Sequence, residues 1–537
     1  MFADTRNQTN ESNDSDNYKE EKTFKSALSQ ILAISAKNVL LLTYGMTIGL
    51  PTIAIPALYS DKSLNSISGK FSDTLQLSRE QISWFSSINL ICVPLGCLMS
   101  GTLTQPFGRK RSMVMLNLPF IVAWLLFHNA STVLELYLAV ALCGMCGGLL
   151  EAPVFTYAAE ITQPHIRGVL SASSAITVIF GVMSQYTLGN FFNWRKVALL
   201  DTFIPIGALI SLLFVPESPY WLISKGRITD AEKSLCWLRG WVKPDKVQFE
   251  LSTIQKSVAS SMQQSRMKKN KTFYSSYLKR TFLLPYFIIT AAFFFGHFGG
   301  MTTLQINAVN IFESLGSPIS GYASIFILGI SQLIGVLLCI ILIHWTGKRP
   351  LVIVSTLGTS LCFFIVSGYA YTRQYNIEAT NNTTTWIPIV FLNMAVFLSY
   401  ISIRSLPWLL IGEVYPPNIR GPASGTSCSS AYIFAFAANK SYFVVLDHIQ
   451  LFGTFLMYAI VNIVGCLVLY KILPETEGRS LQEIQNHFAD KSKTFVTKVT
   501  RNKNKEISEN WAAENTAYEI DPTKSHFTFF HSCKLFT

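Results

Sequence analysis

Acidic and basic residues recur at matched positions in this sequence, in a pattern suited to forming ion pairs. The segment from Glu160 to Gly168 matches the segment from Glu413 to Gly421, with a glutamate seven residues before an Arg-Gly pair in both. Two further segments match in the same order: Gly108-Arg109-Lys110 with Gly347-Lys348-Arg349, and Pro216-Glu217 with Pro474-Glu475. Three matches in register indicate an internal repeat.

The chemistry that these residues allow is a set of switchable charge pairs. Partial dehydration lets an ion pair at a moving interface form and break rather than simply stabilise the fold. The alternative is that the charges only orient the chain, which explains the basic residues but not the matching glutamates. We therefore predict a gate that holds two halves of the protein together, made of Arg109, Glu160, Arg167, Glu217, Arg349, Glu413, Arg420 and Glu475.

The composition indicates that a membrane surrounds most of the chain. Of 537 residues, 50% are hydrophobic and only 14% are charged, whereas soluble domains average about 25% charged residues. These charges are too few to cover the surfaces of several soluble domains. The net charge of +12 does not indicate a nucleic-acid partner, because the basic residues lie in short clusters between apolar runs.

Enzyme chemistry is not indicated. The sequence has no recognisable phosphate-binding loop, metal-ligand set or nucleophile triad, so we expect neither catalysis nor a cofactor. Cys143 and Cys146 form a C-x-x-C, but they lie inside an apolar run without a second ligand pair. We interpret them as small packing residues rather than metal ligands.

Twelve apolar runs of about 20 residues, the length of a membrane-spanning helix, follow one another. They lie near 37–59, 81–103, 112–130, 134–158, 169–190, 195–215, 281–311, 321–343, 349–372, 386–411, 422–446 and 450–473. Residues 1–36 are predicted to be a disordered tail, 216–280 a helical linker, and 474–537 a second tail. Within the linker, Thr229 to Glu232 has the pattern of a capping box that opens a helix toward Arg239.

The basic residues in the short loops predict the orientation. Those after the second, fourth, eighth and tenth runs fall on the same side as both tails and the linker, and this side is cytoplasmic by the positive-inside rule. Two overlapping glycosylation sequons, at Asn381 and Asn382, fall on the opposite side, in agreement. We expect a multi-pass plasma-membrane protein with both termini in the cytosol.

Two charges inside the apolar runs also occupy matched positions. Glu151 lies nine residues before Glu160, and Arg404 lies nine residues before Glu413. Each is therefore roughly 13.5 Å from the cytoplasmic helix end, where a charge is costly unless it is paired or faces water. We hypothesise that the two approach each other as an inner gate when the cavity opens outward. The alternative is that neighbouring polar groups or water satisfy each separately.

The signature segments resemble those of the sugar porter family of the major facilitator superfamily. They are Pro216 to Leu222, the Glu160 to Gly168 loop, Pro407-Trp408 with the segment that follows, and Pro474 to Ser480. Gly45 to Gly49 and Gly296 to Gly300 are similar to the insect facilitated trehalose transporter-like branch. The resemblance implies an all-α membrane protein, with twelve helices in two pseudo-symmetric halves and a sugar bound between them.

The resemblance also implies site residues. Trp408 matches the family's sugar-stacking tryptophan; the alternative is an interfacial anchor. The other candidates for substrate binding are Gln332, Thr302, His297, Ser429 and Thr47. Ala175 and Gly296 stand where the family has amides, and Gln105-Pro106 replaces an Asp-Arg pair of the gate. The site is therefore expected to be roomier, and the gate thinner, than is usual in the family.

The expected function is facilitated uniport of trehalose or a hexose by alternating access, in the lipid bilayer and without an obligate protein partner. Proton-coupled members of the family have an aspartate where this chain has Thr47, and threonine cannot carry a proton as a carboxylate does. His297 could titrate, but we interpret it as a hydrogen-bonding residue. A sugar sensor with little transport and a proton-coupled symporter remain as alternatives.

Overall fold

The chain folds into a bundle of long helices. A computed structural model describes residues 24–59, 75–268, 280–375, 384–415 and 420–477, together with 484, 487 and 488. Across these ranges the only β-structure is one isolated bridge, between Tyr59 and Leu77. The predicted all-α fold class is confirmed.

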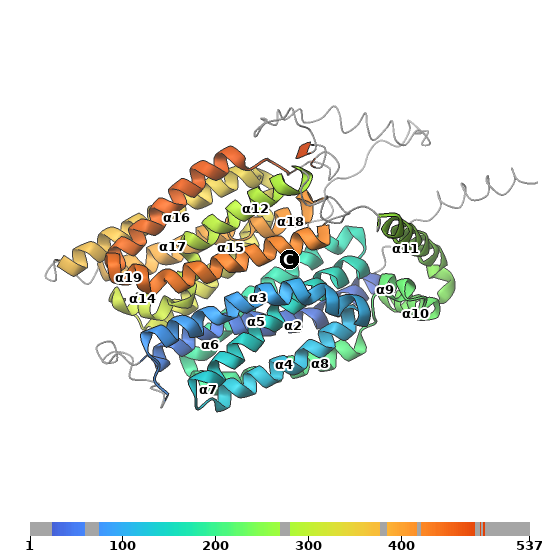
Figure 1. Ribbon diagram of the computed structural model, residues 1–537, viewed down its shortest axis with the longest axis horizontal. Coiled ribbons are helices and arrows are strands. Elements are labelled where there is room, and N and C mark those ends of the chain that lie inside the picture. The colour runs from blue at the N-terminus through green and yellow to red at the C-terminus, as the bar shows by residue number, and fades with distance from the viewer. Residues whose placement is uncertain are drawn as a thin grey trace, which may run out of the picture. The chain divides into compact units, whose positions relative to one another are not determined.

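The first half of the bundle contains six membrane-length segments (Figure 1). They are α2 (Phe24–Leu58), α3 (Arg79–Phe107), α4 (Arg109–Asn129), α5 (Val133–Ile161), α6 (Pro164–Phe191) and the consecutive α7 (Trp194–Asp201) and α8 (Phe203–Phe214). Capping boxes begin α3, at Ser78 with Gln81, and α5, at Thr132 with Glu135. These bonds satisfy backbone N–H groups that the first turn of a helix leaves free.

The second half contains broken helices as well as continuous ones. Its first segment consists of α12 (Arg280–Phe298), α13 (Met301–Ile306) and α14 (Ala308–Ser314), and its fourth of α17 (Ile387–Ile401) and α18 (Leu406–Val414). The continuous helices are α15 (Gly321–Thr346), α16 (Lys348–Tyr375) and α19 (Arg420–Ile472). Within α19, Gln450 has φ 59° and ψ −177°, values that end one helix and start another.

The described residues therefore contain twelve spans, as predicted. Eleven helical stretches are long and apolar enough to cross a membrane, and one of them, Ala423–Ile472, holds the two helices joined at Gln450. Cys143 and Cys146 are buried in α5, consistent with a packing role. Residues Asn381 and Asn382, the predicted glycosylation sites, lie outside the described residues.

The first helix begins earlier than predicted. The assignment of residues 24–36 to a polar tail is wrong, because α2 starts at Phe24. Its first turns are polar but packed: Ser26 and Gln30 donate hydrogen bonds to Gln163 Oε1 at 3.0 and 2.9 Å, and Ser29 donates to the Leu238 carbonyl at 2.8 Å. Polar residues can be buried when they are hydrogen-bonded in this way, so an apolar pattern does not reveal this part of the helix.

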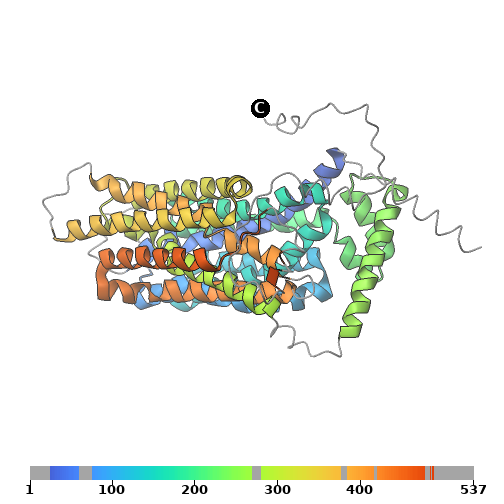
Figure 2. The ribbon, with the colours of Figure 1, turned by 90° about the horizontal axis from the view of Figure 1, so that it is seen from above.

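The linker forms a small helical unit of its own. It comprises α9 (Pro219–Ser224), α10 (Ile228–Leu238), the short 3-10 helix η1 (Pro244–Val247) and α11 (Gln248–Lys268), packed on Trp221, Leu235 and Leu251. The predicted capping box is wrong, because Arg227 is the N-cap of α10 and makes no side-chain cap bond. Figure 2 shows this unit at one end of the spanning helices, which we call the α10 end; the opposite end, beside α14, is the α14 end.

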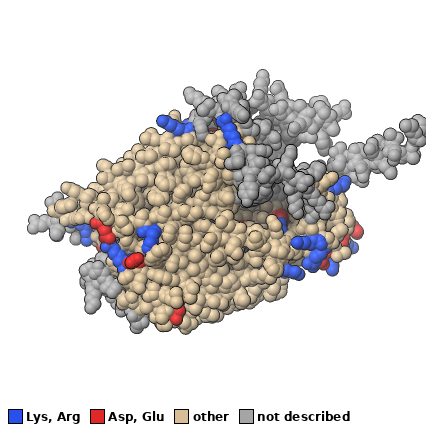
Figure 3. Space-filling view, viewed as in Figure 1, with Lys and Arg blue, Asp and Glu red and all other residues tan. Residues whose placement is uncertain are grey.

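Charged side chains avoid the middle of the bundle surface. On the face drawn in Figure 3, Lys, Arg, Asp and Glu gather toward the two ends, and the area between them is almost free of charge. Exposed apolar side chains such as Leu118, Leu134 and Phe214 lie along the helices. An uncharged band of this kind is what contact with lipid requires.

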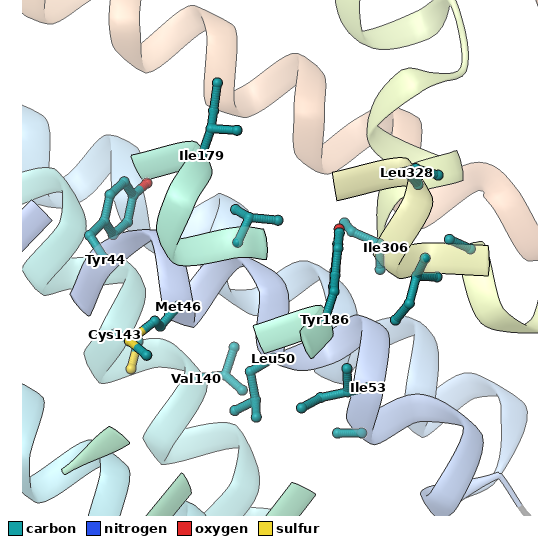
Figure 4. Packing of buried hydrophobic residues seen from close by; sticks show 14 of the residues in the cluster. Tyr44, Met46, Leu50, Ile53, Val140, Cys143, Ile179, Tyr186, Ile306 and Leu328 are labelled. Carbon is teal, nitrogen blue, oxygen red and sulfur yellow. The ribbon is translucent and has the colours of Figure 1, made fainter. Parts of the chain in front are cut away.

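Several contacts between the two halves lie toward the α14 end. An ion pair joins Arg79 of α3 to Asp447 of α19 at 2.5 Å. Thr52 of α2 donates to the Gln305 carbonyl at 2.9 Å. Figure 4 shows Tyr186 of α6 beside residues of both halves, and an added Cβ on Gly329 of α15 would lie 3.2 Å from its ring.

Candidate functional site

Two helices of the second half are interrupted at the same depth in the bundle. Between α17 and α18 the chain leaves the helix at Ser402, with φ −147° and ψ −71°, and Pro407 begins the next helix. Between α12 and α13, Gly300 adopts φ +91°, and a Cβ there would lie 2.4 Å from the ring of Tyr458. Interrupted membrane helices occur where the backbone faces protein or a ligand cavity.

Arg404 bridges these two interruptions. Its Nη1 lies 3.1 Å from His297 Nδ1 and 3.2 Å from Thr302 Oγ1, and these two atoms are 2.8 Å apart. A guanidinium only donates hydrogen bonds, so His297 Nδ1 is an acceptor here and does not carry the proton. The two predicted residues His297 and Thr302 therefore share a site with Arg404, which was predicted to belong to a gate.

Trp408 extends this site with an aromatic surface. The side chain is 37% exposed, although it lies one turn beyond Arg404. Its ring contacts Phe293 edge-on, with centroids 5.1 Å apart, and Tyr432 at 6.0 Å. The Tyr432 hydroxyl accepts a hydrogen bond from Tyr44 of the first half at 3.0 Å. Trp408 thus lies near a contact between the two halves, and its role in stacking on a sugar stays a prediction.

Gln332 belongs to a second polar group. Its side chain is buried, and neither amide atom has a hydrogen-bond partner in the structure. The hydroxyl of Tyr186 is likewise unpartnered, although it lies near the side chains of Gln332 and Gln305. Buried polar atoms without partners point to a ligand or water. Tyr400 links this group to the first, because its hydroxyl is 3.3 Å from Gln305 Oε1 and its ring centre 5.8 Å from the Arg404 guanidinium carbon.

The two remaining candidates for substrate binding do not join these groups. Thr47 donates a hydrogen bond to the Tyr44 carbonyl at 2.7 Å, and Ser429 donates to the Gly425 carbonyl at 2.8 Å. Both hydroxyls are therefore occupied by their own helices.

In the first half, the predicted gate residues form a connected cluster at the α10 end. Arg109 pairs with Glu160 at 2.7 Å. Glu217 accepts hydrogen bonds from the backbone N–H groups of Arg109, Lys110 and Arg111, at 3.0, 2.9 and 3.3 Å. A carboxylate at a helix N-terminus is favoured by these free N–H groups and by the helix dipole. Glu217 therefore caps α4, and Arg109 ties α4 to α5.

The second half repeats this cluster with one exchange. Glu475 accepts from the backbone N–H groups of Lys348 and Arg349 at 3.1 and 2.9 Å and so caps α16. Glu413, however, pairs with Lys348 at 2.6 Å. The Arg349 side chain instead lies over Tyr470 and donates to that residue's carbonyl, so the part predicted for it in the gate is not seen in this structure. Lys348 is the counterpart of Arg109, as their equal places in the repeat imply.

In this structure both clusters connect helices within one half, and the gate between halves stays a prediction. The helix backbones of Arg167 and Arg420 lie at the first turns of α6 and α19, but their side chains lie outside the described part of the chain. Glu151 of α5 has as hydrogen-bonding neighbours the thiols of Cys97 in α3 and Cys428 in α19. Glu151 and Arg404 form no ion pair in the described part of the chain, so the inner gate between them stays a prediction.

Sequence reasoning missed two buried charges. Lys37 of α2 donates to Ser174 Oγ at 2.5 Å, and Asp201 of α7 accepts from Gln185 Nε2 at 2.5 Å. Lys37 was overlooked because it stands at the edge of a predicted span. Asp201 stands inside an apolar run, where a single ionisable residue is itself a signal of function.

Comparison with known proteins agrees with this architecture. A family model described as "Sugar (and other) transporter" matches residues 26–488. The facilitated trehalose transporter Tret1 of Apis mellifera ligustica is 29% identical over 81% of this chain and 85% of its own length. Tret1 of Bombyx mori is 26% identical over 83% of this chain and 86% of its own length.

Solved structures show the same fold. The xylose transporter XylE from E. coli in an inward open conformation superposes with a TM-score of 0.66, at 18% identity, over 86% of this chain and 99% of that one. The proton:xylose symporter XylE bound to 6-bromo-6-deoxy-D-glucose gives a TM-score of 0.64, at 20% identity, over 86% and 98%.

Proposed function

We propose, from the premise that this chain belongs to the sugar transporter family, that it carries trehalose or a hexose across the plasma membrane by facilitated uniport. Transport of sugar through a multi-pass membrane protein follows from the family. The choice of sugar, the uniport mechanism and the cytosolic position of both termini are the proposal.

The observation that carries the proposal is the placement of Trp408. It is a half-exposed indole at a helix break, between a polar group (His297, Thr302 and Arg404) and a tyrosine pair that joins the halves. A sugar offers apolar C–H faces for an aromatic ring and hydroxyls for hydrogen-bonding groups. This combination supports sugar recognition at the interface between the halves.

Alternating access is supported by where the halves touch. The ion pair between the halves, Arg79 with Asp447, and the hydrogen bond from Thr52 to Gln305 lie toward the α14 end. With the α10 end in the cytosol, as the basic loops favour, these contacts would close the outer side. The gate clusters at the α10 end would then form between the halves only in the opposite conformation.

Uniport is supported by Thr47, whose hydroxyl is bonded to its own helix. A second candidate, proton-coupled symport, is favoured by Glu151, a carboxyl in the middle of α5 beside two thiols. Counterflow of labelled trehalose, glucose, fructose and polyols should be measured in vesicles that contain the purified protein. Transport insensitive to proton uncouplers supports uniport; uphill accumulation driven by an imposed pH gradient would reject it, and binding without counterflow would indicate a sensor.

A further inference from the structure

We propose that the site around Trp408 takes a sugar that bears a single carboxylate, such as a hexuronate, and that Arg404 binds this carboxylate. The inference rests on the proposed function, because it names a substrate class for the same site.

Arg404 carries a positive charge that nothing in the described structure balances. Its hydrogen-bonding contacts are His297 and Thr302, both uncharged in this arrangement, and its other named neighbour is the ring of Tyr400. Glu151, the carboxyl at the matched place in the first half, has Cys97 and Cys428 as neighbours instead. A charge within a membrane span is costly unless it is paired or faces water. The missing anion is therefore one that enters the site.

The guanidinium nitrogens of Arg404 that contact neither His297 nor Thr302 are arranged so that they can bind a carboxylate. Only Nη1 contacts His297 and Thr302, which leaves Nε and Nη2. Arg404 is partly exposed, and among the described residues neither nitrogen has a hydrogen-bond partner or is completely buried. These two nitrogens form the fork that binds both oxygens of a carboxylate. The bonds from Nη1 hold the fork in place.

The spacing to Trp408 suits a sugar ring with an acidic substituent. Arg404 lies in the break before α18 and is related to Trp408 through Phe293 and His297. The Phe293 ring lies 5.1 Å from the Trp408 ring and 6.3 Å from the His297 ring, and His297 Nδ1 is 3.1 Å from Arg404 Nη1. A pyranose lying against the exposed indole would therefore direct an acidic substituent past these rings toward the guanidinium.

The single positive charge of this site favours a ligand with one negative charge. Arg404 is the single cation of this group of described residues, because His297 Nδ1 accepts a hydrogen bond and adds no charge. A carboxylate matches one guanidinium, whereas a sugar phosphate brings up to two negative charges into a site that balances one.

The test compares binding of glucuronate, glucose and glucose 6-phosphate to the purified full-length protein by titration calorimetry. The variants are Arg404→Gln, Arg404→Lys and, as a matched control, Arg227→Gln, which removes an arginine paired with Asp230 in the linker unit. Wild type and the control should bind glucuronate about tenfold more tightly than glucose, because charge-assisted bonds are the stronger ones. In Arg404→Gln the ratio of the glucuronate affinity to the glucose affinity should fall to about one, whatever the change in glucose binding itself, and Arg404→Lys should keep part of the preference.

Equal binding of glucuronate and glucose by the wild-type protein would overturn the inference and leave sugar transport intact. A preference that survives in Arg404→Gln would overturn it as well, and so would tighter binding of glucose 6-phosphate than of glucuronate. If Arg404→Gln does not give a monodisperse protein, Arg404→Lys decides, since an unchanged preference there rejects the fork geometry. Absence of binding and of counterflow for every sugar by a monodisperse wild-type protein would reject the proposed function itself.

Discussion

Replacing Gly108 with alanine is expected to damage the turn that connects α3 to α4. Gly108 has φ +99°, and a Cβ there would lie 2.5 Å from Glu217 Oε2. The new methyl group therefore collides with the carboxylate that caps α4. The same substitution strains the backbone, since only glycine adopts this φ without cost.

The two effects can be given magnitudes. Holding a residue with a side chain at a rarely populated φ/ψ costs about 1–3 kcal/mol. A hydrogen bond to a charged group contributes about 1.5–3 kcal/mol, and Glu217 must give up at least one of its three bonds to backbone N–H groups of α4. The sum predicts a loss of about 2.5–6 kcal/mol. Because the capped turn also positions Arg109 for its pair with Glu160, transport should fall together with stability.

Thermal unfolding of the purified protein in detergent, read by fluorescence size exclusion, measures this loss. Gly101→Ala is the matched control, since it lies in the same helix and a Cβ there would meet nothing within 4 Å. In a Glu217→Ala background the collision is gone, so Gly108→Ala should then cost only the backbone strain of about 1–3 kcal/mol. The reasoning is refuted if Gly108→Ala unfolds at the same temperature as Gly101→Ala, or if its cost is unchanged when Glu217 is shortened.

Two predictions concern the site. Trp408→Ala should reduce uptake about tenfold or more, because removing an aromatic side chain on which a ring stacks costs roughly 1–3 kcal/mol of binding free energy. Trp408→Phe keeps an aromatic surface and should retain part of the activity. Near-normal uptake by Trp408→Ala at matched surface expression would contradict this. The single changes Glu151→Arg and Arg404→Glu should each abolish transport, and the double swap should restore part of it if the two charges meet in the other conformation. If the double swap restores no transport although the single and double variants all reach the membrane, the two charges do not form a pair.

The spans were predictable because they depend on a coarse property. About 20 apolar residues in a row are enough to identify a membrane helix, and the repeat located the capped turns at Gly108 and Gly347, which have φ +99° and +83°. The first turns of α2 were not predictable in this way. Ser26, Ser29 and Gln30 are buried through hydrogen bonds to Gln163 and to the Leu238 carbonyl, which are far away in the sequence.

The site was predicted in part, and the limit is again long-range geometry. His297, Thr302 and Trp408 were named from the resemblance, and the structure brings them together. Arg404 was recognised as a charge in a span, but the repeat suggested Glu151 as its partner, whereas the structure places it beside His297 and Thr302. A break at Ser402 sets the direction of its side chain, and the pattern of residues along a helix does not reveal this.

The repeat itself explains why most of the site lies in the second half. The capping carboxylates Glu217 and Glu475 occupy equal places, because each half must end its second span and begin its third with the same turn. The helices that face the site do not match: α5 continues unbroken to Ile161, whereas its counterpart is divided into α17 and α18. The division frees Arg404 to turn toward His297. The two halves thus share the residues that build the fold, and they differ at the candidate site.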